Sequence, residues 1–407
     1  MTVLNIIYGR SSDNGKLGYI LEVDLKYPEK LHDHHQDMPL APEHFCITNN
    51  VISPLMVGKS QYGQSYRAKK LVGTLNDKKS YIVHYKLLKY YIQSGLKIKK
   101  VKKILTFEQS AFMNGYISHL ARLRSDSCNS FEKSVLKKLA NSCYGKMIEN
   151  VRKYKIVKVC QTRNSFLKSA SSPFFEGFKI YNDQLAFCFL KKPVIYMKSF
   201  HAVGLSILDY SKLHMYQLYY DHIIPLTGLS PSNGTIQVVM SDTDSFLLLL
   251  KNMSADQFYR SIESIMDFSN YPKTSKFYST EVAGRLGFLK DETKGQSTIT
   301  GVIALKAKCY SIKTNSSMSL NKLKGVSKVA TSKLSYDDYK NTLMEQKGMR
   351  LTFSKITTKD HKVSTTQLSK SALTFYDDKR FYTCSIHSLP YGHYKVKRDK
   401  IPKCHRC

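Results

Sequence analysis

The chain of 407 residues contains 63 lysines and arginines against 31 aspartates and glutamates, which leaves a formal net charge of +32. An excess of this size predicts a polyanionic partner, with nucleic acid first and an anionic membrane surface second. The longest apolar runs are too short for a transmembrane helix, and residues 1–10 do not form a signal peptide, so no membrane partner is expected.

The first part of the chain mixes strand and helix patterns. A strand is predicted over Gly18–Asp24, and Lys78–Tyr91 combines strand-like and helical spacing. A helical pattern dominates Thr106–Glu149 and is broken around Ser125–Ser130 by turn-forming residues. Tyr154–Val159 is predicted to form a further strand.

The same mixture continues toward the C-terminus. Gln184–Lys191 and the apolar Val302–Ile312 are each predicted to be a strand, Gly204–Tyr220 an amphipathic helix and Asp337–Gln346 a further helix. No internal repeat is visible. Because strands and helices follow one another without regular βαβ alternation, the sequence predicts an α+β fold rather than a doubly wound sheet.

A polar turn between two apolar runs contains the first candidate site. Ile236–Met240 and Phe246–Leu250 are each long enough for a strand, and Ser241–Ser245 between them predicts a tight β-hairpin. Side chains alternate along extended backbone, so Asp242 and Asp244 are expected to project on the same side. Two carboxylates presented together suit a divalent metal ion that binds phosphate oxygens.

A second candidate site lies on the predicted helix upstream. Lys137, Asn141 and Tyr144 are spaced i, i+4 and i+7 and therefore share one helix face, and Gly145 follows them. This face offers a cation for a triphosphate, an amide hydrogen-bonding group and an aromatic ring for a base, while the glycine permits a close approach. Taken alone, the segment also fits a solvated lysine beside a helix end.

Together the two segments resemble motifs B and C of family B DNA polymerases. Lys-x3-Asn-Ser-x-Tyr-Gly at 137–145 precedes Asp-Thr-Asp-Ser at 242–245, and the match is closest to the organellar, viral and self-synthesising-transposon branch, which is often protein-primed. Further segments similar to that branch extend the resemblance over nearly the whole chain: Gly18–Glu43, Lys290–Gly295, Lys306–Tyr310, Asp377–Arg380 and Tyr391–Tyr394.

The resemblance implies a DNA-directed DNA polymerase that acts on a DNA template–primer with two Mg²⁺ ions, or Mn²⁺ in their place. It makes Asp244 the principal motif C metal ligand and Asp242 a neighbouring carboxylate at the same metal. Lys308 and Tyr310 match the Lys-x-Tyr element, which holds the primer strand.

For the incoming dNTP, the resemblance implies a site on the motif B helix. Lys137 would contact the triphosphate, Asn141 and Tyr144 would face the nascent base pair and sugar, and Gly145 would leave room beside them. Whether the primer is a nucleic acid or a terminal protein is left open.

The chain departs from the family at motif A, which supplies an essential aspartate. In the faint echo Asn5–Gly9, Val3 stands at the position of that aspartate. Asp24, in Asp24-Leu25-Lys26-Tyr27-Pro28, imitates the motif with too short a gap and is at best a substitute metal ligand. Since an N-terminal exonuclease also has no room, the chain is expected to be the C-terminal half of a polymerase.

The implied architecture is a right hand. We expect residues 1–105 to form a palm-proximal segment with an incomplete motif A region and 106–160 the helical fingers with motif B. Residues 161–312 would form the palm, whose antiparallel sheet contains motif C and the Lys-x-Tyr element. Residues 313–407 would form a basic, thumb-like C-terminal region.

Two other readings compete with an active polymerase. A polymerase remnant that binds DNA without catalysis also fits the charge and the absent motif A aspartate. A glycosyltransferase with an Asp-x-Asp metal site explains neither the motif B helix nor the charge, and a reverse transcriptase usually has two adjacent aspartates, which Thr243 separates here. The nine scattered cysteines are typical of reduced thiols in an intracellular protein, but the compartment stays open: nucleus, mitochondrion or a viral element.

Two weaker metal candidates remain. His32-Asp33-His34-His35 with Asp37 is expected to be a solvated polar loop. Cys404-His405-Arg406-Cys407 is half of a zinc site and is expected to be a free basic tail.

Overall fold

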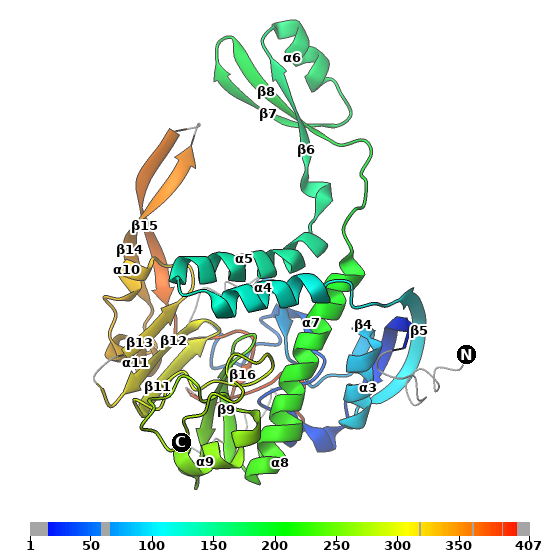
Figure 1. The fold of residues 1–407 in the computed structure, drawn as a ribbon. Coiled ribbons are helices and arrows are strands. Elements are labelled where there is room, and N and C mark those ends of the chain that lie inside the picture. Colours follow the sequence, from blue (N-terminus) through cyan, green and yellow to red (C-terminus); the bar gives the residue numbers. More distant parts are fainter. Residues whose placement is uncertain (1–14, 58–65, 317–318, 360–361, 385, 397–407) are drawn as a thin grey trace. The chain divides into compact units, whose positions relative to one another are not determined.

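The structure is a computed structural model that divides into two compact units (Figure 1). It describes residues 15–57, 66–316, 319–359, 362–384 and 386–396. Unit 1 comprises residues 1–109, 209–355 and 366–407, and unit 2 comprises residues 110–208 and 356–365. Within the described residues both units mix helices with small sheets whose registered strand pairs are antiparallel, so the predicted α+β class is confirmed.

Unit 1 begins with a three-stranded sheet in the order β4-β1-β5. The central strand β1 (Leu17–Lys26) pairs antiparallel with β4 (Lys78–His84) and β5 (Lys97–Glu108). The fully buried side chains of β1 are Leu21, Val23 and Leu25. Their alternation with more exposed neighbours is what a strand with one covered face requires. Helix α3 (Tyr85–Gln93) contributes Leu87, Leu88 and Tyr91 to the same core.

The C-terminal segment of the described chain returns to the N-terminal region of unit 1. There β2 (Glu43–Thr48) pairs with β3 (Arg67–Val72), and β16 (Phe381–Tyr382) pairs with β17 (Ser388–Leu389). A shared core joins the two regions: Ile47, Ile52, Met56 and Val72 pack with Phe375, Phe381 and Tyr391. The final residues of a thumb-like region were not expected there, because no local pattern predicts such a long-range contact.

Helix α7 (His201–Tyr216) confirms that the segment predicted to be an amphipathic helix is helical. It continues into a π-helical segment, η3 (Gln217–Ile223), and then into α8 (Ile224–Thr227). Gly228 ends the run in a left-handed conformation with φ of 66°, which suits a residue without a Cβ atom.

The predicted hairpin is present in unit 1. Strand β9 (Ile236–Ser241) pairs antiparallel with β10 (Phe246–Leu250), and the register shifts between Leu247 and Leu248. Ile236 is fully buried in a core with Phe258 of α9 (Ala255–Ser261) and with Ile262, which links α9 to η4 (Glu263–Ile265). Burial of these apolar side chains holds the base of the hairpin and leaves its turn at the surface.

A second sheet of unit 1 has the order β11-β12-β13. Its strands are β11 (Ile299–Lys306), β12 (Cys309–Thr314) and β13 (Ser319–Leu323). The single strand predicted over Val302–Ile312 is therefore wrong, because the chain reverses at Lys308, whose φ is 62°. The remaining elements after this sheet are α10 (Lys328–Thr331), α11 (Tyr336–Met344), β14 (Met349–Lys359) and β15 (Lys362–Leu373). Helix α11 confirms the helix predicted over Asp337–Gln346.

Unit 2 contains a helical pair and a small sheet (Figure 1). Helices α4 (Asn114–Asp126) and α5 (Ser130–Met147) confirm the predicted helical region and its break, except that its first residues, 106–108, belong to strand β5. Asn129 caps α5, because its side chain accepts a hydrogen bond from the backbone nitrogen of Phe131 at 2.8 Å. The sheet has the order β6-β8-β7 and a helix beside it: β6 (Lys155–Cys160), α6 (Arg163–Ala170), β7 (Phe175–Asn182) and β8 (Leu185–Lys191).

The compact units have different boundaries from the predicted domains. The predicted start of the fingers at residue 106 lies close to the start of unit 2 at Ser110. The boundary predicted at 160/161 separates β6 from β8, although the two strands pair along their length. The boundary at 312/313 falls inside β12. No helix among the described residues is both long enough and apolar enough to cross a bilayer.

Candidate functional site

The turn that joins β9 and β10 has a compact backbone. The Asp242 nitrogen donates a hydrogen bond to the Ser245 oxygen at 3.2 Å, and the Asp244 nitrogen donates one to the Asp242 oxygen at 2.7 Å. Thr243 is left-handed, with φ of 64°. The two aspartates therefore do not stand on extended backbone, and the alternation used to predict their common direction does not apply to them.

The turn lies against the reversal between β11 and β12. The Lys308 ammonium forms an ion pair with Oδ1 of Asp242. The lysine side chain is 47% exposed and the aspartate side chain 30%, so the pair remains open to solvent. The hydrogen bond from Lys308 is the main cause that lowers the pKa of Asp242 below its usual value. Two predicted site residues from separate motifs are thus in direct contact.

Tyr310, Glu292 of the segment Lys290–Gly295, and Lys324, which no motif marks, complete this neighbourhood. Burial, and then the negative charges of Asp242 and Glu292, raise the pKa of Tyr310. Lys324 follows β13, its backbone nitrogen donates to the Lys308 oxygen at 3.1 Å, and its charge helps to lower the pKa of Asp242. No motif marks Lys324, whose position follows from the pairing of β13 with β12.

The fit of divalent ions to this turn is partial. Asp244 is exposed and Asp242 is half-buried, and carboxylate oxygens are the ligands that Mg²⁺ prefers. However, no group of three or more histidines, cysteines, aspartates or glutamates within the described residues is arranged to hold a metal ion. The carboxylates of the turn do not make a two-ion site by themselves, and the two Mg²⁺ ions, or Mn²⁺, stay a prediction.

Asp24 lies in the β4-β1-β5 sheet with its carboxylate already engaged. Oδ1 accepts a hydrogen bond from the backbone nitrogen of Ser80 at 2.7 Å and lies 2.9 Å from the Lys102 ammonium. The hydrogen bond from Ser80, followed by the one from Lys102, lowers the pKa of Asp24. A metal ion there would compete with a bound cation. Its role as a substitute ligand stays a prediction, and Val3 and the echo Asn5–Gly9 lie outside the described residues.

The motif B residues lie on α5 in unit 2. Lys137 and Asn141 are exposed, Tyr144 is half-buried, and all three lie within one continuous helix, so they share a face as predicted. A Cβ atom added to Gly145 would meet no heavy atom within 4 Å. The motif B and motif C residues belong to different compact units.

The histidine-rich segment is not the solvated loop that was expected. His32 and His35 lie in the short helix α2 (His32–His35), and both are buried. Nδ1 of His32 accepts a hydrogen bond from the Tyr394 nitrogen at 3.0 Å, which places the unprotonated position of the neutral ring at Nδ1. A metal ion at Nε2 would have to displace the remaining proton. The segment Cys404–Cys407 lies outside the described residues.

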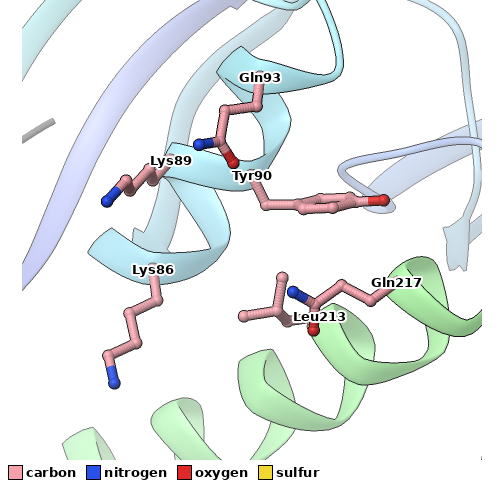
Figure 2. Close-up of a pocket in the computed structure, with 6 residues that line it drawn as sticks. All are labelled: Lys86, Lys89, Tyr90, Gln93, Leu213 and Gln217. Carbon is pink, nitrogen blue, oxygen red and sulfur yellow. The ribbon is translucent and has the colours of Figure 1, made fainter. Parts of the chain in front are cut away.

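A small cavity of unit 1 lies between α3 and α7 (Figure 2). Its volume is about 170 Å³, and its lining residues are Lys86, Lys89, Tyr90, Gln93, Leu213 and Gln217. The Tyr90 hydroxyl donates to Asp221 at 3.2 Å, so the tyrosine is part of a structural contact. Ligand pockets usually measure about 300–1,000 Å³. This cavity is therefore too small for a nucleotide.

Comparisons with known protein families, with curated proteins and with solved structures find no match for this chain.

Proposed function

We propose that this chain is the polymerase portion of a family B-like DNA polymerase, which adds dNTPs to a primer 3′-hydroxyl under the direction of a DNA template. One observation supports this most strongly. The motif C residue Asp242 and the Lys-x-Tyr residue Lys308 are 66 positions apart and form an ion pair. Two segments selected for their resemblance to one active site thus meet in space.

The contact has a use in the proposed function. Lys308 is half-exposed and carries a charge that a DNA phosphate would attract, while Asp242 holds its ammonium at the turn. Tyr310 stands on the strand that leaves the same reversal. Lys308 and Tyr310 would therefore position the primer strand beside the carboxylates of the turn.

The motif B face of α5 would bind the incoming dNTP. The exposed Lys137 offers a cation to the triphosphate, and Asn141 and Tyr144 offer an amide and a ring to the base pair and sugar. Mg²⁺ held by Asp242 and Asp244 would neutralise phosphate charge at the reacting centre. A further carboxylate is required for a second ion, and Asp24 is already paired with Lys102, just as Asp242 would have to exchange Lys308 for the first ion.

We therefore expect tight, salt-sensitive binding of DNA by this chain and little or no primer extension by the chain alone. The net charge of +32 supports the binding, because each phosphate neutralised by a lysine or arginine releases counterions and makes affinity fall with salt. If the chain binds DNA but does not extend a primer under any condition, it is a DNA-binding polymerase remnant.

The test is primer extension on a labelled template–primer with Mg²⁺, in parallel with DNA-binding measurements from low to high salt. Asp244→Ala should lower any extension by at least about 100-fold, since it removes the principal metal ligand. Asp337→Ala makes the same charge change at an exposed site on α11 and should leave extension unchanged. Extension that survives Asp244→Ala would refute the polymerase assignment. DNA binding without a salt dependence would refute the electrostatic part of the proposal.

A further inference from the structure

The small sheet of unit 2 has one face that helix α6 covers in part, with Phe178 and Ile180 still exposed there, and one open face. Helix α6 covers the first through Phe166, which packs against the buried Cys160, Cys188 and Leu190. Because successive side chains of a strand point to opposite faces, Phe187 and Phe189 of β8 lie on the other side of the sheet.

The strand register identifies the neighbours of these two rings. Val159 of β6 and Lys179 of β7 both pair with Phe187, and residues directly opposite in a ladder share a face. On the neighbouring row, Phe189 pairs with Val157 and with Gly177. The open face therefore combines Phe187 and Phe189 of β8 with Val157 and Val159 of β6, while β7 places Gly177 and Lys179 beside the two rings.

Exposure shows that this face is accessible. The side chains of Val157 and Val159 are 53% and 58% exposed, although a valine in a sheet is normally covered. A Cβ atom added to Gly177, beside Phe189, would meet no heavy atom within 4 Å. The ring of Tyr181, also 53% exposed, meets that of Phe187 edge-on with centroids 6.4 Å apart. A flat group therefore has room to lie beside these rings.

The segment that contains this sheet carries an excess of positive charge. Residues 155–192 contain seven lysines and arginines against two acidic residues. Lys155 and Lys191 are directly opposite each other at the end of the ladder, on the same face as the two phenylalanines. Glu176 pairs with Lys155 at 3.0 Å, and Lys191 is exposed.

We propose that this open face binds single-stranded nucleic acid, with bases stacked on Phe187 and Phe189 and with the backbone phosphates contacted by lysines that include Lys179 and Lys191. Aromatic rings on an open sheet flanked by cations are the combination that single strands require, because every base has a flat face and every linkage a negative charge. The charge of the segment favours this polyanion over a neutral protein partner. The proposal is independent of the polymerase assignment, since it involves neither the carboxylates nor α5.

The test uses the full chain and a single-stranded oligonucleotide of mixed sequence that contains photoreactive 5-iodouracil. After irradiation, the adducts should map to peptides that contain Phe187, Phe189 or Tyr181. In solution, affinity is measured by fluorescence anisotropy at a salt concentration that suppresses weaker binding. The double variant Phe187→Leu/Phe189→Leu keeps the apolar bulk but removes the rings, and it should bind the oligonucleotide at least about tenfold more weakly. Its salt dependence should stay unchanged, because no charge is lost.

Charge variants provide the matched comparison. Lys191→Gln should weaken binding and reduce the slope of log affinity against log salt by about 0.7, as expected for one lost phosphate contact on a single strand. Lys168→Gln makes the same change on the exposed side of α6 and should have a smaller effect. Adducts confined to other peptides, or equal losses for Lys191→Gln and Lys168→Gln, would overturn the proposal. An unchanged affinity of the phenylalanine variant would also overturn it. If that variant kept its affinity but changed the self-association of the chain, the open face would bind a second copy of the chain and not nucleic acid. None of these readouts requires primer extension, so a failure of the polymerase assignment would leave them intact.

Discussion

At the scale of single residues, the ion pair between Asp242 and Lys308 is the most informative contact. Both residues stand on tight reversals, and the positive φ of Thr243 and of Lys308 is unusual for residues with a side chain. Backbone strain of this kind persists where surrounding structure holds it, and it often accompanies function. Here the two reversals bring a carboxylate and an ammonium together at the surface.

The pair leads to a prediction for Lys308→Gln. Loss of the ammonium should raise the pKa of Asp242 toward its usual value, because the hydrogen bond from Lys308 is the main cause of its lowering. Carboxylate ¹³C NMR titration of aspartate-labelled protein measures this. An aspartate whose pKa is lowered in the folded protein stabilises the fold at pH values above its unfolded-state pKa. This contribution is lost as the pH falls through its folded-state pKa. Since the pair is exposed, the change in stability should be within about 1 kcal/mol.

The matched variant Lys340→Gln removes one exposed charge on α11 and should leave the Asp242 titration in place. If the Asp242 pKa does not rise in Lys308→Gln, the contact between the two turns does not form in solution.

At the scale of elements, α5 combines a regular helix with an exposed glycine. The helix spans 18 residues, none of which is buried, so no residue of the helix is enclosed in a hydrophobic core. Glycine inside a helix is usually destabilising because of its backbone freedom. Gly145 has no neighbour that would exclude a larger residue, so internal packing does not explain it.

Gly145→Ala should therefore raise the stability of the helix by about 0.5–1 kcal/mol. Thermal unfolding followed by circular dichroism measures this change. If the glycine leaves room for a nascent base pair, the same variant should bind dNTP and template–primer more weakly despite its greater stability. The substitution Ser134→Ala, at an exposed position of the same helix, provides the control for a simple gain in helix propensity. A destabilised Gly145→Ala protein would contradict the open surroundings of this residue.

At the scale of the whole molecule, unit 1 joins the first and last described parts of the chain. Phe375, Phe381 and Tyr391 pack into the core formed by residues around β2 and β3. Near this core the imidazole rings of His32 and His393 lie with centroids 5.5 Å apart, and both residues are buried. Asp33 lies 3.4 Å from Nε2 of His393. Because buried imidazole rings resist protonation, we expect the stability of the contact between the segments that contain His32 and His393 to depend on pH.

Stability should accordingly fall as the pH is lowered from about 6.5 to about 4. Burial lowers the pKa of His393 to about 4 and that of His35 to about 3. Above 6.5 these rings are neutral in both states. Below it the unfolded chain binds protons that the folded protein excludes, so the free energy of unfolding decreases until the folded-state pKa is reached. Urea unfolding at several pH values should show a loss on the order of 1–3 kcal/mol from buried histidines.

His393→Gln should reduce this pH dependence even if it lowers stability at neutral pH, whereas His119→Gln, at an exposed position of α4, should retain it. Equal pH dependence in all three proteins would show that the buried rings do not titrate in this way.

Local patterns were sufficient for much of this molecule. Alternation and turn residues predicted β1, the β9–β10 hairpin and α11, because those features depend on neighbours in the chain. The i, i+4, i+7 spacing was likewise enough to place the motif B residues on one face of α5. By contrast, the reversal at Lys308 was missed, since its flanking residues are apolar on both sides and form one continuous strand pattern.

The sequence by itself determined the mixed α+β class, the net positive charge and the residues of the two motifs, because composition and short-range spacing encode them. Only the tertiary structure decided that Lys308 meets Asp242, that Lys324 joins them, and that His32 and His35 are buried. It alone decided that Phe187 and Phe189 share an open face with lysines. These features depend on strand register and on contacts between distant segments, which no local pattern specifies.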